Sequence, residues 1–238
     1  MSNSLLILGS TGLVGGQVVK FAQTSKDFSK IFTVTRRKPE FANTASTTES
    51  PRIDTIVETD SSKWPQAISN LEPAPLAYIS AFGTTRANAG SAEKFKEIDY
   101  GINYESAKAA KEAGAKVCVL VSSYGANAKS PFLYMKTKGE LENAIIDLKF
   151  PYTIILQPGV LLGERNESKG FGNDWAVKFG KLCKGTWFAP LLQPIEASDL
   201  GRIAVEFAER GLKGEFRENV LKVSGSELTE LVDDFKIV

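Results

Sequence analysis

The chain has 238 residues, of which 42% are hydrophobic and 24% charged, so it is long enough for one sizeable soluble domain. Its 29 basic and 28 acidic side chains nearly cancel, which argues against a nucleic-acid partner held by bulk charge. The two cysteines, Cys118 and Cys183, match no metal-ligand spacing and cannot form a disulfide framework, which indicates an intracellular, reducing compartment. No apolar run approaches the ~20 residues that span a bilayer, and we expect no removable targeting segment.

Short apolar segments alternate with longer amphipathic ones along most of the chain. Several short segments are apolar at every position, as strands buried on both faces of a parallel sheet are. This alternation predicts the α/β class, with a Rossmann-type doubly wound parallel sheet. Strands are predicted at residues 5–8, 31–35, 53–58, 76–81, 116–122, 152–156 and 219–224. Helices are predicted at residues 13–23, 92–113, 134–148, 171–184, 198–210 and 226–235.

The remaining segments set the domain organisation. Residues 41–51 and 163–175 have the polar composition of surface loops. We find no internal repeat or linker, so a single domain is predicted over residues 1–238. The regular pattern fades near residue 162, and residues 163–238 are interpreted as a smaller C-terminal elaboration of the core formed by residues 1–162.

The first strand runs into a glycine-rich turn, "GSTGLVGG", that opens the first helix. The first glycine permits a tight turn, the second lets the backbone approach a pyrophosphate, and the third lets the helix pack against the sheet. The GxxGxxG spacing differs from the usual GxGxxG, and glycine turns are common, but a position between strand and helix favours dinucleotide binding at the helix N-terminus. The predicted cofactor contacts in this turn are Gly9, Ser10, Thr11, Gly12, Leu13, Val14 and Gly15.

The second strand ends in Arg36 and Arg37, at the place where NAD-selective proteins carry a carboxylate for the ribose 2′-OH. Guanidinium groups pair with phosphate through forked donors, so the two arginines favour the 2′-phosphate of NADP(H). The alternative is a solvated charge pair at a strand end. Asp60, after the third strand, would either meet the adenine or cap a helix that begins at Ser61 or Ser62.

Two further strand ends are expected to border the cofactor. Ala81, Phe82 and Gly83 end the fourth strand, where glycine lets the chain run close to a ligand, and Pro158 follows the sixth. Asn103, on the long helix behind the sheet, is expected to make a polar contact in mid-helix.

The fifth strand ends in "VSSYG", and Tyr134 follows Ser122 by 12 positions and Ser123 by 11. Tyr134 and Lys138 are four residues apart and therefore share one face of a helix. A tyrosine ordinarily titrates near ~10, and a neighbouring ammonium group favours its phenolate. A serine hydroxyl can orient a carbonyl oxygen for hydride delivery. The YxxxK pattern is weak alone, but after a glycine turn and a serine pair it predicts a catalytic site.

The segments "GSTGLVG", "VLVSSYGAN", "YMKTKGELE" and "ILQPGVLLGER" together resemble atypical short-chain dehydrogenase/reductases. The likeness is greatest to the Tat-interacting oxidoreductase-like group and its fungal mitochondrial relatives, and it runs from the N-terminus to about residue 165. It implies an NADP(H)-binding Rossmann domain with a site formed by Ser122 or Ser123, Tyr134 and Lys138. Relatives often read "LRPG" where this chain has Gln157, so a guanidinium group is missing near the predicted site.

The sequence therefore predicts an NADP(H)-dependent oxidoreductase that moves a hydride between the nicotinamide and a small carbonyl or alcohol substrate. Tyr134 would be the general acid, and Lys138 would assist it and bind the nicotinamide ribose. Ser122 or Ser123 would hold the substrate oxygen. One alternative is a cofactor-loaded interaction or redox-sensor protein with vestigial catalysis. Another is a sugar-nucleotide epimerase or dehydratase, which the short stretch after the sixth strand disfavours.

The expected partner is the small-molecule carbonyl substrate, and a monomer and a homodimer both remain open. Residues 174–192 are aromatic, apolar and basic, a composition that favours core and substrate lid over a membrane-docking face. By resemblance alone, the protein would lie peripherally on the cytosolic face of the mitochondrial outer membrane.

Overall fold

The computed structural model describes residues 3–39, 51–163 and 193–236. Within these ranges, seven parallel strands form one sheet in the order β3-β2-β1-β4-β5-β6-β9. The chain therefore winds outward from β1 in one direction and then, from β4, in the other, as in a doubly wound fold. The strands are β1 (Asn3–Leu8), β2 (Phe28–Thr35), β3 (Arg52–Val57), β4 (Ala77–Ser80), β5 (Val117–Val121), β6 (Tyr152–Gln157) and β9 (Val220–Ser224).

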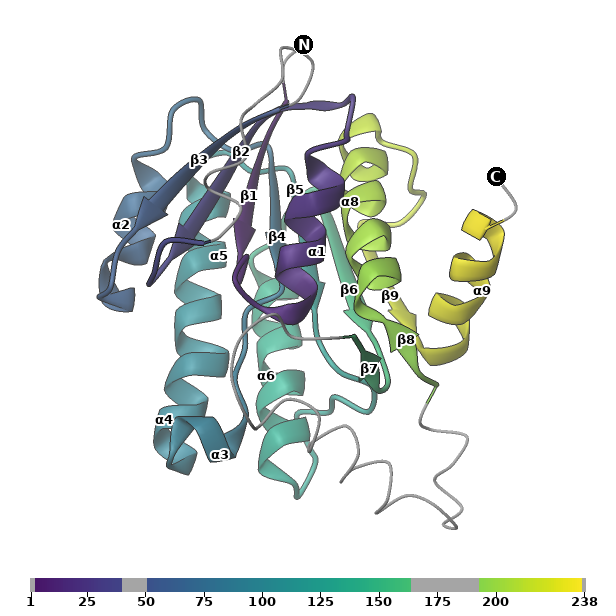
Figure 1. Ribbon diagram of the computed structural model, residues 1–238. Helices are drawn as coiled ribbons and strands as arrows, with labels where there is room; N and C mark the ends of the chain where they lie inside the picture. The colour runs from purple at the N-terminus through teal and green to yellow at the C-terminus, as the bar shows by residue number, and fades with distance from the viewer. Residues whose placement is uncertain (1–2, 40–50, 164–192, 237–238) are drawn as a thin grey trace.

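Helices cover both faces of this sheet (Figure 1). On one face lie α1 (Leu13–Ala22) and α8 (Ala197–Lys213), and on the other lie α2 (Trp64–Ser69), α5 (Asn103–Glu112) and α6 (Leu133–Asp147). Strand β1 shows why residues 5–8 are apolar in succession. Leu5 and Ile7 belong to the core under α1 and α8, whereas Leu6 and Leu8 belong to the core on the opposite face. The predicted fold class is thereby confirmed.

The segment predicted as one helix over residues 92–113 is wrong as a single element. It consists of α4 (Ala92–Lys96), a π-helical turn η3 (Glu97–Ile102) and α5. The Asn103 side chain donates to the Asp99 carbonyl, 2.9 Å away, and so holds the polar turn in place. The same Asn103 side chain also bonds Ser80 and Phe82, which are 23 and 21 residues away, and the 3.6-residue period of a helix does not record such distant partners.

Several short elements also escape the sequence pattern. They are α3 (Arg86–Ala89) and the small parallel pair β7 (Leu161–Leu162) and β8 (Ile195–Glu196). The helix expected to begin at Ser61 or Ser62 is present as η2 (Ser61–Lys63), which leads into α2. After α8, strand β9 pairs with β6, and α9 (Gly225–Lys236) follows it. The boundary placed at residue 162 stays a prediction. The loop at 41–50, the loop from residue 164 onward, the helix at 171–184 and the segment 174–192 lie outside the described residues.

Candidate active site

The glycine turn between β1 and α1 is packed so tightly that two of its glycines are required by the fold itself. Gly9 has a φ of +84°, in the left-handed region, and a Cβ there would lie 2.7 Å from the Ala81 carbonyl carbon and the Phe82 nitrogen. A Cβ on Gly15 would lie 2.1 Å from the Gly9 oxygen. The turn therefore holds the start of α1 close to the end of β4.

Gly12 differs from these two, because its environment is open enough for a ligand. It is the N-cap of α1, and among the described residues a Cβ there would meet only the Gly9 oxygen, at 3.2 Å. The first N–H groups of a helix have no partner within the helix, so this end offers donors and a positive dipole to an anion. Val14 belongs to the core, so only its backbone is available to a ligand.

Ser10 supplies an independent sign that this cradle fits a phosphate group. Its side chain is buried, and its hydroxyl oxygen has no hydrogen-bond partner among the described residues. Buried hydroxyl groups are normally paired, because an unpaired polar atom removed from water is unfavourable. A dinucleotide phosphate at the N-terminus of α1 would supply the missing partner.

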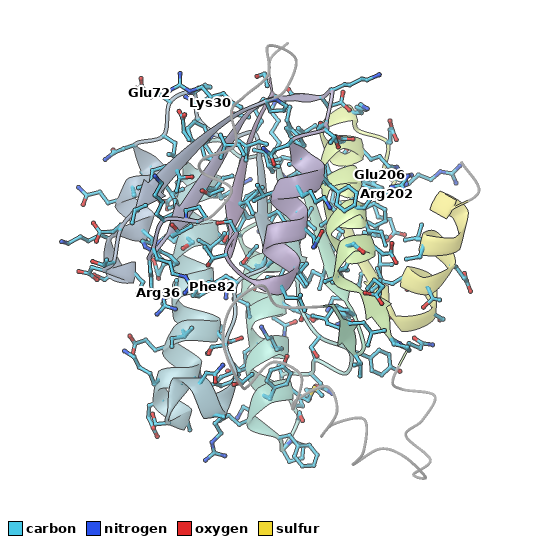
Figure 2. The ribbon with its side chains drawn as sticks, in the orientation of Figure 1. Lys30, Arg36, Glu72, Phe82, Arg202 and Glu206 are labelled. Atoms are coloured by element: carbon cyan, nitrogen blue, oxygen red, sulfur yellow. The ribbon has the colours of Figure 1, made fainter. Side chains whose placement is uncertain are left out.

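A cavity of about 480 Å³ lies beside this turn. It is bordered by the turn itself and by the carboxyl ends of β2 and β4, where ligands bind in open α/β sheets. Figure 2 shows Arg36 and Phe82 close to each other at this edge of the sheet. The lining residues are Gly9, Thr11, Val34, Thr35, Arg36, Arg37, Thr59, Trp64 and Phe82. The arginines predicted to select NADP(H) thus share one cavity with the predicted pyrophosphate turn.

After the third strand, the cavity wall is formed by Thr59 and by Trp64, the first residue of α2, and not by Asp60. Asp60 is the N-cap of η2, and its carboxylate accepts from the Ser62 backbone N–H at 3.0 Å and from the Ser62 hydroxyl at 2.6 Å. These bonds from Ser62 lower the pKa of Asp60. Of the two roles open from sequence, the structure shows the capping role. The Trp64 ring packs edge-on against Phe82, with 5.4 Å between centroids, a contact that propensity does not reveal.

Tyr134 and Lys138 share one face of α6, as their spacing predicts. Tyr134 is 37% exposed and packs against the buried Phe95 ring, and the Lys138 Nζ lies 5.9 Å from the centre of the Tyr134 ring. Burial, the largest influence, lowers the pKa of the Lys138 ammonium group, but the charges of Asp99, Tyr134 and Glu142 together raise it above its usual value. Lys138 therefore stays charged beside an accessible phenol.

The two serines at the end of β5 lie in different environments. Ser122 is buried, and its hydroxyl donates to Oε1 of the buried Glu142 at 2.5 Å. The Ser123 hydroxyl makes only one long contact among the described residues, 3.5 Å to the Tyr124 carbonyl. Ser123 is thus the serine whose hydroxyl is available to a ligand.

Glu142 joins several elements under this site and escaped the sequence reasoning. Gln157 donates to both of its carboxylate oxygens, at 2.8 and 3.0 Å, and the Lys222 ammonium lies 3.0 Å from Oε2. Gln157 therefore makes a polar contact at the position where the resemblance led us to expect arginine. The sequence does hold one indication of this position. Glu142 lies four residues after Lys138 and hence on the same face of α6.

Backbone contacts complete the arrangement. The Tyr124 N–H donates to the Pro158 carbonyl at 2.8 Å, which ties the loop after β5 to the end of β6. Gly83 lies against Lys138, because a Cβ on this glycine would stand 3.2 Å from the lysine Nζ. Ala81 and Phe82 contact the glycine turn. The predicted site residues at the ends of β1, β2, β4, β5 and β6 therefore meet along one edge of the sheet.

Comparison with known proteins assigns the family. Residues 9–177 match the model of NAD(P)H-binding domains. The chain belongs to this family. It is 57% identical over 230 residues to Protein FMP52, mitochondrial, of Candida albicans, which covers 97% of this chain and 98% of that protein. It is 40% identical over 229 residues to the Saccharomyces cerevisiae protein of the same name, which covers 95% of each. The resemblance to atypical short-chain dehydrogenase/reductases with fungal mitochondrial relatives is confirmed.

Solved structures agree on the fold at low sequence identity. The structure of gox2181 has a TM-score of 0.72 at 12% identity and covers 96% of both chains. WbmG of Bordetella bronchiseptica, in complex with NAD, has a TM-score of 0.65 at 16% identity and covers 100% of this chain and 79% of the other. Family and fold together support a nicotinamide cofactor and an oxidoreductase-type protein. No helix within the described ranges has the length and apolar character needed to cross a membrane.

Proposed function

We propose that the protein is an NADP(H)-dependent reductase of a small carbonyl compound. The observation that carries this proposal is the single sheet edge at which two half-sites meet. One is the cavity that Arg36 and Arg37 share with the glycine turn, and the other contains Tyr134 and the charged Lys138. A dinucleotide that lies along this edge would present its adenosine end to the arginines and its nicotinamide end to the tyrosine.

Each residue then has a defined task. The Ser10 hydroxyl and the N-terminus of α1 bind the pyrophosphate, and the guanidinium groups of Arg36 and Arg37 pair with the 2′-phosphate. Lys138 donates to the nicotinamide ribose hydroxyls. When bound, the cofactor would supply the hydride that the carbonyl carbon takes up.

The proton comes from the protein. Tyr134 donates its phenolic proton to the carbonyl oxygen, so that the carbonyl becomes an alcohol and the phenolate remains beside the Lys138 ammonium. The Ser123 hydroxyl donates a hydrogen bond to the same oxygen and orients it. Ser122 is the poorer candidate for this task, because its hydrogen already goes to Glu142.

The test has two steps. The first is titration of the purified protein with NADPH and with NADH, in which NADPH should bind more tightly. The second is steady-state turnover on a panel of aldehydes, ketones and quinones with the preferred cofactor. Equal affinity for the two cofactors would overturn the NADP(H) assignment. Tight NADPH binding with no turnover on the whole panel would favour the cofactor-loaded interaction or redox-sensor protein.

We further propose a peripheral position on the cytosolic face of the mitochondrial outer membrane. The support is the word mitochondrial in the names of the relatives, together with the resemblance to their group. Protease treatment of intact mitochondria should degrade the protein, and alkaline carbonate should release it from the membrane. Protection from protease until the outer membrane is ruptured would contradict this position.

A further inference from the structure

Asp99 is a completely buried carboxylate in the π-helical turn η3, between α4 and α5. A π-helical turn is rare and often marks a functional site. A carboxylate without water is stable only when both its charge and its lone pairs are matched. The partners of Asp99 therefore indicate what this turn is for.

Both carboxylate oxygens are held from the side of the proposed cofactor site. Oδ2 accepts from the Thr84 backbone N–H at 2.7 Å, and Oδ1 lies 2.6 Å from the Lys138 Nζ. The Lys138 side chain is 6% exposed and that of Asp99 is 0% exposed. The pair lies against the backbone of Gly83, since a Cβ there would stand 3.1 Å from Oδ1. Asp99 is thus the fixed counter-ion of Lys138.

The turn itself is braced against the end of β4. Asn103 donates to the carbonyls of Asp99, at 2.9 Å, and Phe82, at 3.2 Å, and it accepts from the Ser80 hydroxyl at 2.5 Å. Phe82 also lines the cavity. The bonds of Asn103 therefore connect the cavity wall to the turn that presents Asp99.

The glutamate carboxylates that follow Lys138 on α6 have partners of their own. Glu142, one turn further along α6, is paired with Lys222 from β9, and Lys96 of α4 is paired with Glu140 at 3.1 Å. Among these groups, Asp99 alone touches the Lys138 ammonium. An ammonium group has three N–H donors, so the ion pair with Asp99 leaves donors for other partners.

We infer that Asp99 is a positioning residue, which fixes the Lys138 ammonium beside Tyr134 and sets the pH at which this site first loses a proton. This inference rests on the proposed function. Removal of the Asp99 charge makes the surroundings of Tyr134 and Lys138 more positive, so whichever group is more acidic gives up its proton at lower pH. Replacing Asp99 with a neutral residue should therefore lower the pH at which the first proton is lost from Tyr134 and Lys138.

The experiment compares Asp99→Asn with wild type and with Glu97→Gln, which removes an exposed carboxylate from the same turn. In the cofactor-free protein, ionisation is followed by tyrosinate absorbance, corrected with Tyr134→Phe, and by carbon NMR of the Lys138 Cε. Asp99→Asn should shift the first ionisation down by at least about one pH unit. In the enzyme with cofactor bound, the loss of turnover at high pH should likewise move to lower pH in Asp99→Asn. Glu97→Gln should match wild type in both.

A second comparison covers the case in which Asp99→Asn does not fold, because it leaves a buried ammonium unpaired. Lys138→Met leaves Asp99 alone beside the tyrosine, and Lys138→Met/Asp99→Asn removes both charges. The double variant should form tyrosinate at lower pH than the single one. The inference would be overturned if Asp99→Asn left the ionisation unchanged both in the wild-type protein and in the Lys138→Met variant. Failure of the proposed function would instead appear as absent turnover with these ionisation shifts intact.

Discussion

The hydroxyl of Ser122 donates its hydrogen to the buried carboxylate of Glu142, with 2.5 Å between the two oxygens. A serine has one hydrogen to donate, so Ser122 offers only lone pairs to anything else that approaches it. Ser123 has no comparable bond within the described residues. Two adjacent serines that look equivalent in the sequence are therefore expected to behave differently when each is changed to alanine.

Ser123→Ala should lower turnover by about a hundredfold or more, because it removes a donor to the substrate oxygen, and should change stability by less than about 0.5 kcal/mol. Ser122→Ala should lower the free energy of unfolding by about 1.5–3 kcal/mol, because it removes a buried hydrogen bond to a charged group. Its effect on turnover should be the smaller one. Urea unfolding and steady-state rates measure the two effects, and the reverse pattern would return the substrate role to Ser122.

Arg36→Ala/Arg37→Ala should weaken NADPH binding by about tenfold or more and leave NADH binding unchanged, because only NADPH carries the phosphate that these guanidinium groups pair with. Fluorescence titration with both cofactors measures this. Arg52→Ala is the matched control, since Arg52 lies on the neighbouring strand β3 and pairs with Asp54 outside the cavity lining. Equal losses of NADPH and NADH affinity in the double variant would contradict phosphate recognition.

Gly12→Val should abolish dinucleotide binding in a protein that still folds, because the new side chain stands at the open N-terminus of α1. Gly15→Val should instead prevent stable folding, because its Cβ would overlap the Gly9 oxygen. Gly16→Ala is the control, since its Cβ would lie at an ordinary 3.7 Å from the Ser10 oxygen. Circular dichroism and cofactor titration separate these outcomes. Normal affinity in Gly12→Val would mean that this glycine has no part in binding.

Tyr134→Phe should reduce turnover by about a hundredfold or more with little change in NADPH affinity, because the ring and its packing on Phe95 remain while the proton donor is lost. Lys138→Ala should weaken both turnover and cofactor binding. Tyr152→Phe, which alters a tyrosine at the amino end of β6, is the control and should match wild type. A Tyr134→Phe variant as fast as wild type would show that another group supplies the proton.

The sheet could be predicted from sequence because the apolar residues that form each strand follow one another in the chain. Leu5, Leu6, Ile7 and Leu8 are apolar in succession, since alternate side chains meet helices on opposite faces. The glycine turn and the Tyr134–Lys138 spacing are local in the same sense. Each feature is set by residues that lie close together in the chain, so a single sequence displays it.

The turn that presents Asp99 could not be predicted in this way. It is braced by Asn103, whose partners Ser80 and Phe82 lie 23 and 21 residues away. Glu142 likewise looked like one charge among several on α6, because its partner Ser122 is 20 residues away and Lys222 is 80 residues away. Buried polar networks are built from such distant pairs, so the pattern of neighbouring residues does not record them.

The ion pair between Glu142 and Lys222 also bears on how the protein matures during synthesis. Strands β1 to β6 leave the ribosome before β9, yet the carboxylate beneath the Tyr134 helix has its cationic partner on β9. Until residue 222 emerges, a nascent chain can form most of the sheet but must leave Glu142 either hydrated or without its counter-charge. Helix α6 should therefore reach its final packing only after β9 has been synthesised and has joined the sheet.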